Sequence, residues 1–302
     1  MKTSAQAMLI GSFVADSLAL GVHWVYDTEE IIRNYSTVKT LLPPHQKSYH
    51  PTKDGGDFTH YGDQALHLLE YLSKRGGEFS PADYAAEWQK YIAVYDGYLD
   101  RASRDTLGNM EEGVHKVDCG SMSSDLGGPA RIAPLIYCYR HNLDGLLQAV
   151  SDYCALTHCG MGISDGALFL ARSCYSILHG ASPRKAFEKA MAFTFEDLKL
   201  DLRLRSSLEM QNLNVIEVTK NFGQMCAINA ALPGAVYTIL DNEKNYERAL
   251  TETVMSGGDS AARGMVVGMM LGAHLGPDTI PPAWWSNMNA RTQIQKSIDN
   301  LP

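Results

Sequence analysis

The sequence predicts an all-α protein, folded as a single compact helical bundle over residues 1–302. Capped segments with helical spacing of apolar residues recur along the chain, whereas the alternating pattern of strands is nearly absent. No linker and no internal repeat divides the chain, so we expect one domain. With 302 residues, of which 45% are hydrophobic and 20% charged, the chain is large enough to bury a substantial core.

The first predicted helix lies in residues 7–25, a nearly apolar segment that resembles a signal sequence or a membrane span. Asp16 stands in its middle, and His23 follows near its end. A carboxylate is unfavourable in lipid and is foreign to the apolar region of a signal sequence. We therefore expect a buried core helix in a cytoplasmic protein that does not associate with membranes.

Four further segments carry helical signals. Ser80 and Pro81 form a cap and a first-turn proline ahead of residues 84–95, and Ser182-Pro183 does the same for residues 184–193. Residues 64–72 place leucines at helical spacing. Near the end of the chain, glycines recur every four residues within an apolar run. This spacing leaves a flat helix face that another backbone can approach closely, namely Gly264, Gly268 and Gly272.

Charge and cysteine usage limit the classes of partner and compartment. The net charge is −8 and no dense basic run occurs, so a nucleic-acid partner is not expected. None of the six cysteines forms a CxxC pair, and several lie in apolar segments. We interpret them as reduced, mostly buried thiols rather than as a disulfide framework.

Carboxylates and histidines are placed at the starts of predicted helices. A helix over residues 60–67 puts His60, Asp63 and His67 on one face. Asp259 follows two glycines and precedes the glycine-spaced helix, and Asp16 shares a face with His23. Carboxylates from separate helices are the ligands that hard divalent cations require.

A purely structural interpretation explains the same residues. Asp259 is a good N-cap and has Arg263 four residues later as an ion-pair partner. Asp63 is a second candidate cap, and His60 and His67 fit the exposed face of a helix. The local pattern alone favours these structural roles.

Five segments, in order, resemble motifs of the ADP-ribosylglycohydrolase family. GSFVADSL (11–18) resembles the opening helix of the family, and YGDQ (61–64) lies at its Thr-Asp-Asp-Thr metal motif. GGPARIAPL (127–135) is similar to the segment that cradles ADP-ribose, and TH (157–158) to a Thr-His pair. GGDSAARG (257–264) resembles the motif Gly-Gly-Asp-Thr-Asp-Thr-x-Gly. Together they span almost the whole chain.

The resemblance implies a helical bundle around a cleft, with two divalent ions, usually magnesium or manganese. Members hydrolyse the N- or O-glycosidic bond at the ribose carbon of ADP-ribose, with a carboxylate-activated water as the attacking group. Transferred to this chain, the catalytic residues would be Asp63, His23 and His60, and the metal ligands Asp63, Asp259 and Asp16. The substrate-binding residues would be Tyr61, Gly127, Gly128, Arg131 and His158.

The departures from the family motifs remove expected oxygen ligands. Tyr61 and Gly62 stand where active members carry paired aspartates, and Ala261 and Ala262 replace the second aspartate and the threonine of the last motif. His23 stands at an early glutamate position. We therefore expect at most one magnesium or manganese ion, with no ion as an equal alternative.

The substitutions resemble those of a particular branch, which includes the jellyfish J-type lens crystallins. The resemblance implies an enzyme that hydrolyses an ADP-ribosyl or related ribosyl bond in a small molecule or an ADP-ribosylated partner. The alternative is a non-catalytic protein, ligand-binding or structural like the crystallins, that retains the fold.

Overall fold

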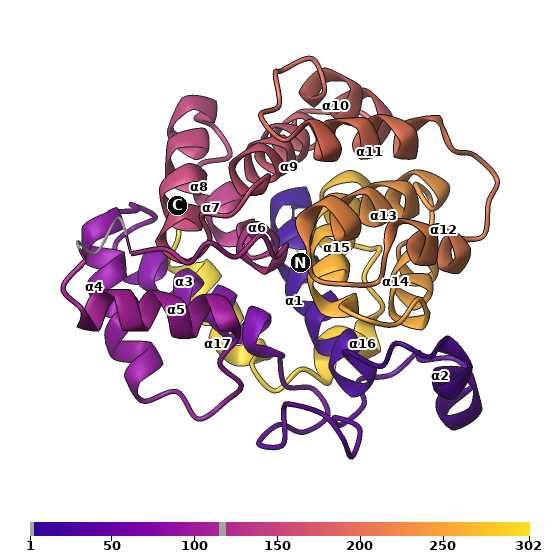
Figure 1. The fold of residues 1–302 in the computed structure, drawn as a ribbon, viewed down its shortest axis with the longest axis horizontal. Helices are drawn as coiled ribbons and strands as arrows, with labels where there is room; N and C mark the ends of the chain where they lie inside the picture. The colour runs from indigo at the N-terminus through magenta and orange to yellow at the C-terminus, as the bar shows by residue number, and fades with distance from the viewer. Residues whose placement is uncertain (1–2, 115–118) are drawn as a thin grey trace.

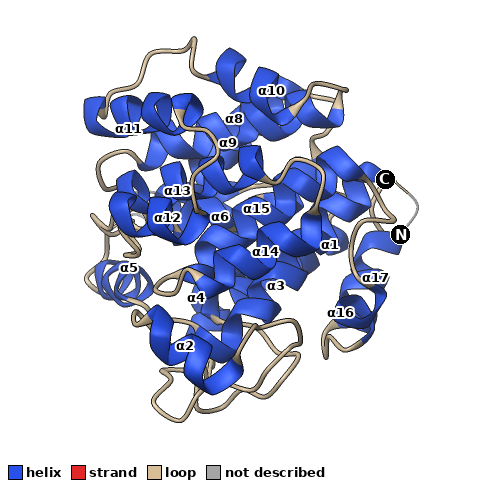
Figure 2. Ribbon diagram, turned by 90° about the vertical axis from the view of Figure 1, so that its right-hand side faces the viewer, coloured by secondary structure: helices blue, strands red, loops and turns tan. Residues whose placement is uncertain are grey.

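The computed structural model describes residues 3–114 and 119–302. In these residues, helices are joined by loops, and β-structure is limited to isolated bridges such as Ser121 with His158 (Figure 1; Figure 2). The predicted all-α fold is confirmed.

The centre of the molecule is formed by α1 (Ser4–Ala19) and α15 (Ser260–Leu275), which pack along each other (Figure 1). Both helices are buried around nearly their whole circumference, as the absence of a polar stripe in their sequences requires. The 19 residues Ser4–Val22 are long and apolar enough to cross a membrane, but 89% of the most apolar stretch is buried inside the protein. This burial agrees with the predicted core helix.

Glycines allow the backbones of α1 and α15 to touch. A Cβ atom added to Gly268 would lie 2.3 Å from the carbonyl oxygen of Gly11, and one added to Gly272 would lie 2.3 Å from that of Ala7. No side chain fits at these separations, so only glycine permits the contact. The close approach predicted from the glycine spacing is confirmed.

The remaining helices surround this pair. Those with many contacts to α15 or α1 are α3 (His60–Lys74), α7 (Ala133–Cys138), α9 (Ile163–Leu178), α13 (Ile228–Asp241) and α14 (Tyr246–Met255). The others are η1 (Leu20–Val22), α2 (Thr28–Tyr35), α4 (Pro81–Ala93), α5 (Arg101–Glu111), α6 (Gly127–Ala130), α8 (Leu143–Thr157), α10 (Pro183–Ala190), α11 (Leu198–Glu209), α12 (Val215–Phe222), α16 (Pro282–Ser286) and α17 (Arg291–Asp299).

The predicted helix starts are close to those observed. Ser80 and Ser182 are the N-cap residues of α4 and α10, and the Ser182 hydroxyl accepts a hydrogen bond from the Lys185 amide at 3.4 Å. The helix expected over residues 64–72 is longer at both ends, because Thr59 caps it and His60 is its first residue. None of the six cysteines takes part in a disulfide, in agreement with the expected reduced thiols.

Candidate functional site

The start of α3 is fixed by a buried carboxylate from α1. Asp16 accepts hydrogen bonds from the Thr59 amide at 2.8 Å and from the Thr59 hydroxyl at 2.6 Å. A Cβ atom on Gly62 would lie 2.4 Å from Asp16 Oδ2, so glycine is required beside this carboxylate. Burial raises the pKa of Asp16 to about 7, although the bonds from Thr59 oppose the shift.

Three imidazole rings meet beside this helix start. His60 is the first residue of α3, His23 follows η1, and His50 lies in the loop before α3. His50 Nε2 and His60 Nδ1 are 3.2 Å apart, and one ring nitrogen of each of the three lies within 4.8 Å of the others. All three side chains are buried. We call His23, His50 and His60 the histidine cluster.

Asp259 lies on the other side of His23, as the N-cap of α15. Its Oδ1 accepts from the Ala262 amide at 3.4 Å, and its Oδ2 accepts from the Tyr61 hydroxyl at 3.3 Å. His23 Nδ1 lies 3.8 Å from Asp259 Oδ1. Burial raises the pKa of Asp259 to about 6, against the opposing charge of Arg263. The carboxyl group therefore changes charge near neutral pH.

Asp100, the N-cap of α5, faces the histidine cluster from a third side. Its Oδ2 lies 3.6 Å from His60 Nε2, and its Oδ1 accepts from the Ser103 amide at 2.7 Å. Burial disfavours its charge, but the neighbouring His60, His158 and Arg131, with the bond from Ser103, hold the pKa of Asp100 at about 2. The site thus contains one carboxylate that stays ionised and two that titrate near neutrality.

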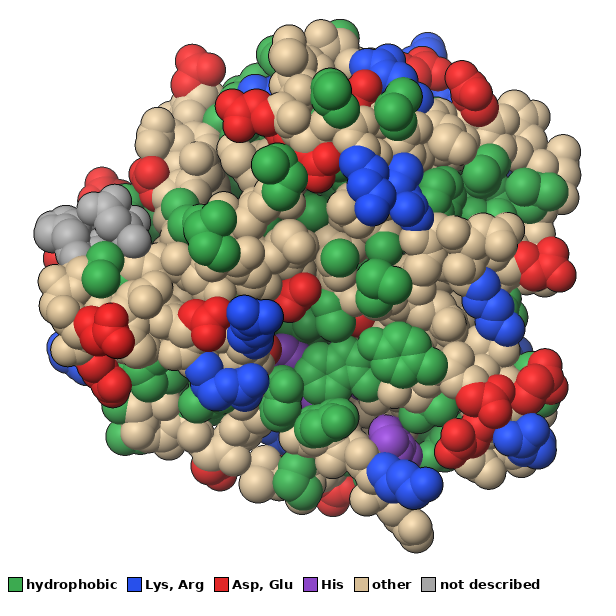
Figure 3. Space-filling view, in the orientation of Figure 1, with side chains coloured by type: hydrophobic (Ala, Val, Ile, Leu, Met, Phe, Trp, Pro, Cys, Tyr) green, Lys and Arg blue, Asp and Glu red, His purple; other side chains and the backbone are tan. Residues whose placement is uncertain are grey.

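Aromatic side chains cover the histidine cluster. The Trp24 ring lies 4.2 Å from that of His23 and 5.5 Å from that of His60, measured between centroids, and Tyr98 packs against it at 5.1 Å. Trp24 has a φ of 65°, and its amide donates to the Gly258 carbonyl at 2.8 Å. Holding a tryptophan in this region takes about 1–3 kcal/mol from the surrounding contacts. Figure 3 shows histidine at the bottom of a hollow beside a group of hydrophobic side chains.

Asp63 points to a different environment. Its Oδ2 lies 2.6 Å from Lys53 Nζ and accepts from the Tyr95 hydroxyl at 2.5 Å. Its described contacts are therefore with these two residues and not with Asp259 or the histidine cluster. His67, one turn further along the helix, stacks on Tyr91 at 4.3 Å. The structure brings Asp259, His23, His60 and Tyr61 together, whereas Asp16 is bound to Thr59 and Asp63 to Lys53 and Tyr95.

The expected ADP-ribose segment packs directly against the site. Gly127 and Gly128 are buried in α6. A Cβ atom at Gly127 would lie 2.3 Å from the Tyr61 ring, and one at Gly128 would lie 2.9 Å from the ring of His158. The two glycines therefore allow α6 to contact both aromatic rings.

Arg131 and His158 meet through Thr157. The Thr157 hydroxyl accepts from Arg131 Nη2 at 3.0 Å and lies 2.8 Å from His158 Nδ1. Arg131 also lies over the Tyr153 ring at 5.8 Å. Both Arg131 and His158 are buried, so in this conformation they support the wall of the site from within.

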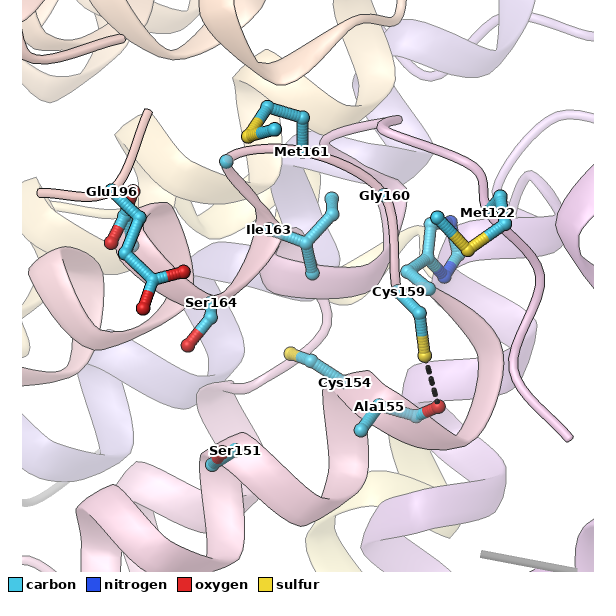
Figure 4. Close-up of a pocket in the computed structure, with 13 residues that line it drawn as sticks. Met122, Ser151, Cys154, Ala155, Cys159, Gly160, Met161, Ile163, Ser164 and Glu196 are labelled. Carbon is cyan, nitrogen blue, oxygen red and sulfur yellow. Dashed lines mark hydrogen bonds between the residues drawn. The ribbon is translucent and has the colours of Figure 1, made fainter. Parts of the chain in front are cut away.

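A separate pocket lies behind His158, between α8 and α9 (Figure 4). Its volume is about 300 Å³, and its lining is mostly apolar or sulfur-containing, with Met122, Cys154 and Met161 among the side chains. His158 therefore borders both this pocket and Gly128 of α6.

Sequence reasoning missed His50 and Asp100. His50 lies in a loop without helical periodicity, ten residues before its partner His60, and no motif marks it. Asp100 precedes Arg101 at the start of a short helix, where an acidic residue is an ordinary cap. The available signal was the recurrence of histidine at positions 45, 50 and 60, in this loop and directly after it.

The comparisons agree on one family. The family model for ADP-ribosylglycohydrolase matches residues 2–302. Crystallin J1A from Tripedalia cystophora is 25% identical over 99% of this chain and 96% of its own length. ADP-ribosylhydrolase ARH3 from Gallus gallus is 24% identical over 60% of this chain and 58% of its own.

A solved structure described as an ADP-ribosylglycohydrolase-related protein complex has the same fold. It superposes with a TM-score of 0.77, at 20% identity, and the match covers 98% of this chain and 96% of that one. The family match spans the segments that carry the buried carboxylates and histidines described above. This chain belongs to the ADP-ribosylglycohydrolase family.

Proposed function

We propose that the chain is a hydrolase that cleaves the glycosidic bond of an ADP-ribosyl or related ribosyl substrate. The observation that carries the proposal is Asp259, a buried carboxyl group at a helix start whose pKa is raised to about 6. A general acid or base works best when its pKa lies near the operating pH. The family membership supplies the class of bond.

Asp259 is suited to hold or move one proton in this reaction. Its Oδ2 accepts from the Tyr61 hydroxyl at 3.3 Å, which orients the carboxyl group, and His23 lies at 3.8 Å from Oδ1. As the ionised form it would accept a proton from the water molecule that attacks the anomeric carbon, and this proton would pass to the leaving nitrogen or oxygen as the glycosidic bond breaks. We assign Tyr61 and His60 to the wall that positions the ribose, and Trp24 to the cover that excludes bulk water.

Asp63 and Asp16 receive positioning roles in this proposal. Asp63 is engaged by Lys53 at 2.6 Å and by Tyr95 at 2.5 Å, so little of its charge is available to a substrate. Asp16 holds the start of α3 through Thr59, and this in turn places His60 and Tyr61.

The donor set does not fit a magnesium or manganese pair of the family type. Members of the family are metal-dependent, and such hard ions require several oxygen ligands. Here the carboxylates already have partners: Asp16 is bound by Thr59, and Asp63 by Lys53. The groups that converge are ring nitrogens, which suit other ions. No step of the proposed reaction is therefore assigned to magnesium or manganese.

A screen of riboside hydrolysis with matched variants tests the proposal. ADP-ribosyl-arginine, ADP-ribosyl-serine and simpler N-ribosides would be incubated with wild type, Asp259→Asn and Asp165→Asn, with and without added divalent ions. We expect turnover by wild type, and a loss of about 10²–10⁴-fold in Asp259→Asn, the usual contribution of a general acid or base. Asp165, in α9, is the control, because its carboxylate already accepts from the Asp197 amide at 2.7 Å. Equal turnover in all three proteins would contradict the role of Asp259.

A non-catalytic, crystallin-like role is the second candidate. It is favoured by the relatives Crystallin J1A and Crystallin J1B, the latter 26% identical over 95% of this chain and 92% of its own length. Under this alternative, wild type and both variants hydrolyse none of the substrates, while their melting temperatures show that they are folded. The same screen therefore separates the two candidates.

A further inference from the structure

We propose that His23, His50 and His60 bind one divalent transition-metal ion of the zinc type. The donors are nitrogen atoms, so this site differs in ligand class from the oxygen-rich magnesium or manganese sites considered above. It does not depend on riboside hydrolysis, because ion binding can be measured in the absence of substrate.

The spacing of the ring nitrogens fits a common ion. Zinc–nitrogen bonds of about 2.0–2.1 Å in a tetrahedral arrangement place neighbouring ligand nitrogens roughly 3.3 Å apart. His50 Nε2 and His60 Nδ1 are 3.2 Å apart. One ring nitrogen from each of the three histidines lies within 4.8 Å of the others, so each can offer one ligand to a single ion.

Polar atoms without partners point to a ligand. Among the described residues, neither ring nitrogen of His23 has a hydrogen-bond partner, although the side chain is only 1% exposed. Leaving a buried polar group unsatisfied costs about 1–3 kcal/mol, and native structures rarely do so. An ion between the three rings would give His23 a partner. It would also replace the hydrogen bond between His50 Nε2 and His60 Nδ1 with two metal–nitrogen bonds.

The outer nitrogen of each ring faces an oxygen. His60 Nε2 lies 3.6 Å from Asp100 Oδ2, and His23 Nδ1 lies 3.8 Å from Asp259 Oδ1. His50 Nδ1 lies 3.4 Å from the Ser48 hydroxyl. Metal-bound histidines commonly direct their second nitrogen to such oxygens, which set the tautomer and the ring orientation. Of these oxygens, the Ser48 hydroxyl lies within hydrogen-bond distance of its ring, and the two carboxylates lie slightly beyond it.

Burial of the three side chains favours the neutral imidazole that coordination requires, because a buried charge is costly. Neutral imidazole is a ligand for zinc, cobalt, nickel and copper, whereas magnesium prefers oxygen. The adjacent Asp259 and Asp100 supply negative charge close to the ion.

Ion binding by the purified, metal-stripped full chain tests the proposal. We would titrate it with Co²⁺, follow the visible absorption of the bound ion, and then displace it with Zn²⁺. We expect one bound ion per chain, a spectrum of nitrogen coordination, displacement by Zn²⁺ and no displacement by an excess of Mg²⁺. Zn²⁺ should also raise the melting temperature, because an ion that binds the folded state stabilises it.

Two histidine variants separate the cluster from other histidines. His50→Gln removes one ligand from a loop, and His67→Gln is the matched control on α3, where His67 stacks on Tyr91. We expect His50→Gln to weaken binding by more than about 100-fold, beyond the 10–100-fold typical of an outer-shell residue. His67→Gln should bind as wild type does.

Several outcomes would overturn the site. They are no stoichiometric binding by folded wild type, equal binding by the two variants, or displacement of Co²⁺ by Mg²⁺ at similar concentration. Should His50→Gln fail to fold, His23→Gln replaces it, and circular dichroism identifies which variant is folded. If wild type binds the ion but hydrolyses no riboside, only the proposed function is refuted. If wild type hydrolyses a riboside but binds no ion, only the metal site is refuted.

Discussion

The two sides of the first turn of α3 differ in whether their charged groups are paired. On one side, His60 and Tyr61 face a buried group of neutral rings and a carboxyl group that titrates near neutrality. On the other, two residues along, Asp63 is paired with Lys53 and Tyr95. Gly62 lies between the two, against Asp16. One helical turn therefore carries buried neutral rings on one side and a closed ion pair on the other, and the proposed reaction is assigned to the former.

The largest expected effect comes from restoring an aspartate at the boundary. Gly62→Asp puts back an acidic residue where active relatives have one, but its Cβ would lie 2.4 Å from Asp16 Oδ2 and 2.8 Å from the Phe58 side chain. Overpacking and a second buried charge should together lower the free energy of unfolding by about 3–5 kcal/mol. Urea unfolding measures the change, and Gly62→Ala isolates the steric part. A stable Gly62→Asp protein would mean that Asp16 can turn away.

A second effect concerns the charge of Asp16 itself. Its pKa is about 7 in the folded state against an ordinary value of 3.8, so its stabilising contribution is present below pH 3.8 and is lost as the pH rises through 7. Asp16→Asn should therefore gain stability relative to wild type between about pH 5 and pH 8, by roughly 3 kcal/mol. Unfolding free energies of both proteins at the two pH values test this, since the buried histidines titrate alike in both. A constant difference would show that Asp16 is ionised throughout.

The smallest effect is expected from the paired side. Asp63→Asn leaves Lys53 without its partner, and because both side chains retain some exposure the loss of stability should be about 1–2 kcal/mol. Turnover on any riboside that the protein hydrolyses should fall less than about 10-fold, against the 10²–10⁴-fold expected for Asp259→Asn. Steady-state kinetics of the two variants measure these losses of turnover. A larger loss in Asp63→Asn than in Asp259→Asn would place the reacting centre at Asp63.

How well the sequence predicted each feature depends on how far apart in the chain the interacting residues are. Helix starts at Ser182 and Asp259 and the glycine contact of α15 depend on residues within a few positions, and the structure confirms them. The position of His50 depends on how a loop returns to its partner ring, which no local pattern encodes. The ion-pair partner of Asp63 is Lys53, which lies ten residues earlier in the loop before α3. Spacing alone could therefore not assign that carboxylate to an ion pair.

The contact between α1 and α15 has a consequence for how this fold can change. The close approaches of Gly268 to Gly11 and of Gly272 to Ala7 are between backbones, so a side chain at either glycine of α15 would push the helices apart. His23 follows one of these helices and Asp259 precedes the other. These two residues of the proposed site therefore stand at helix ends, outside the glycine contact, and can be exchanged without altering that contact. The packing of α1 on α15 and the residues of the site can thus change independently, which allows one fold to carry different site chemistries.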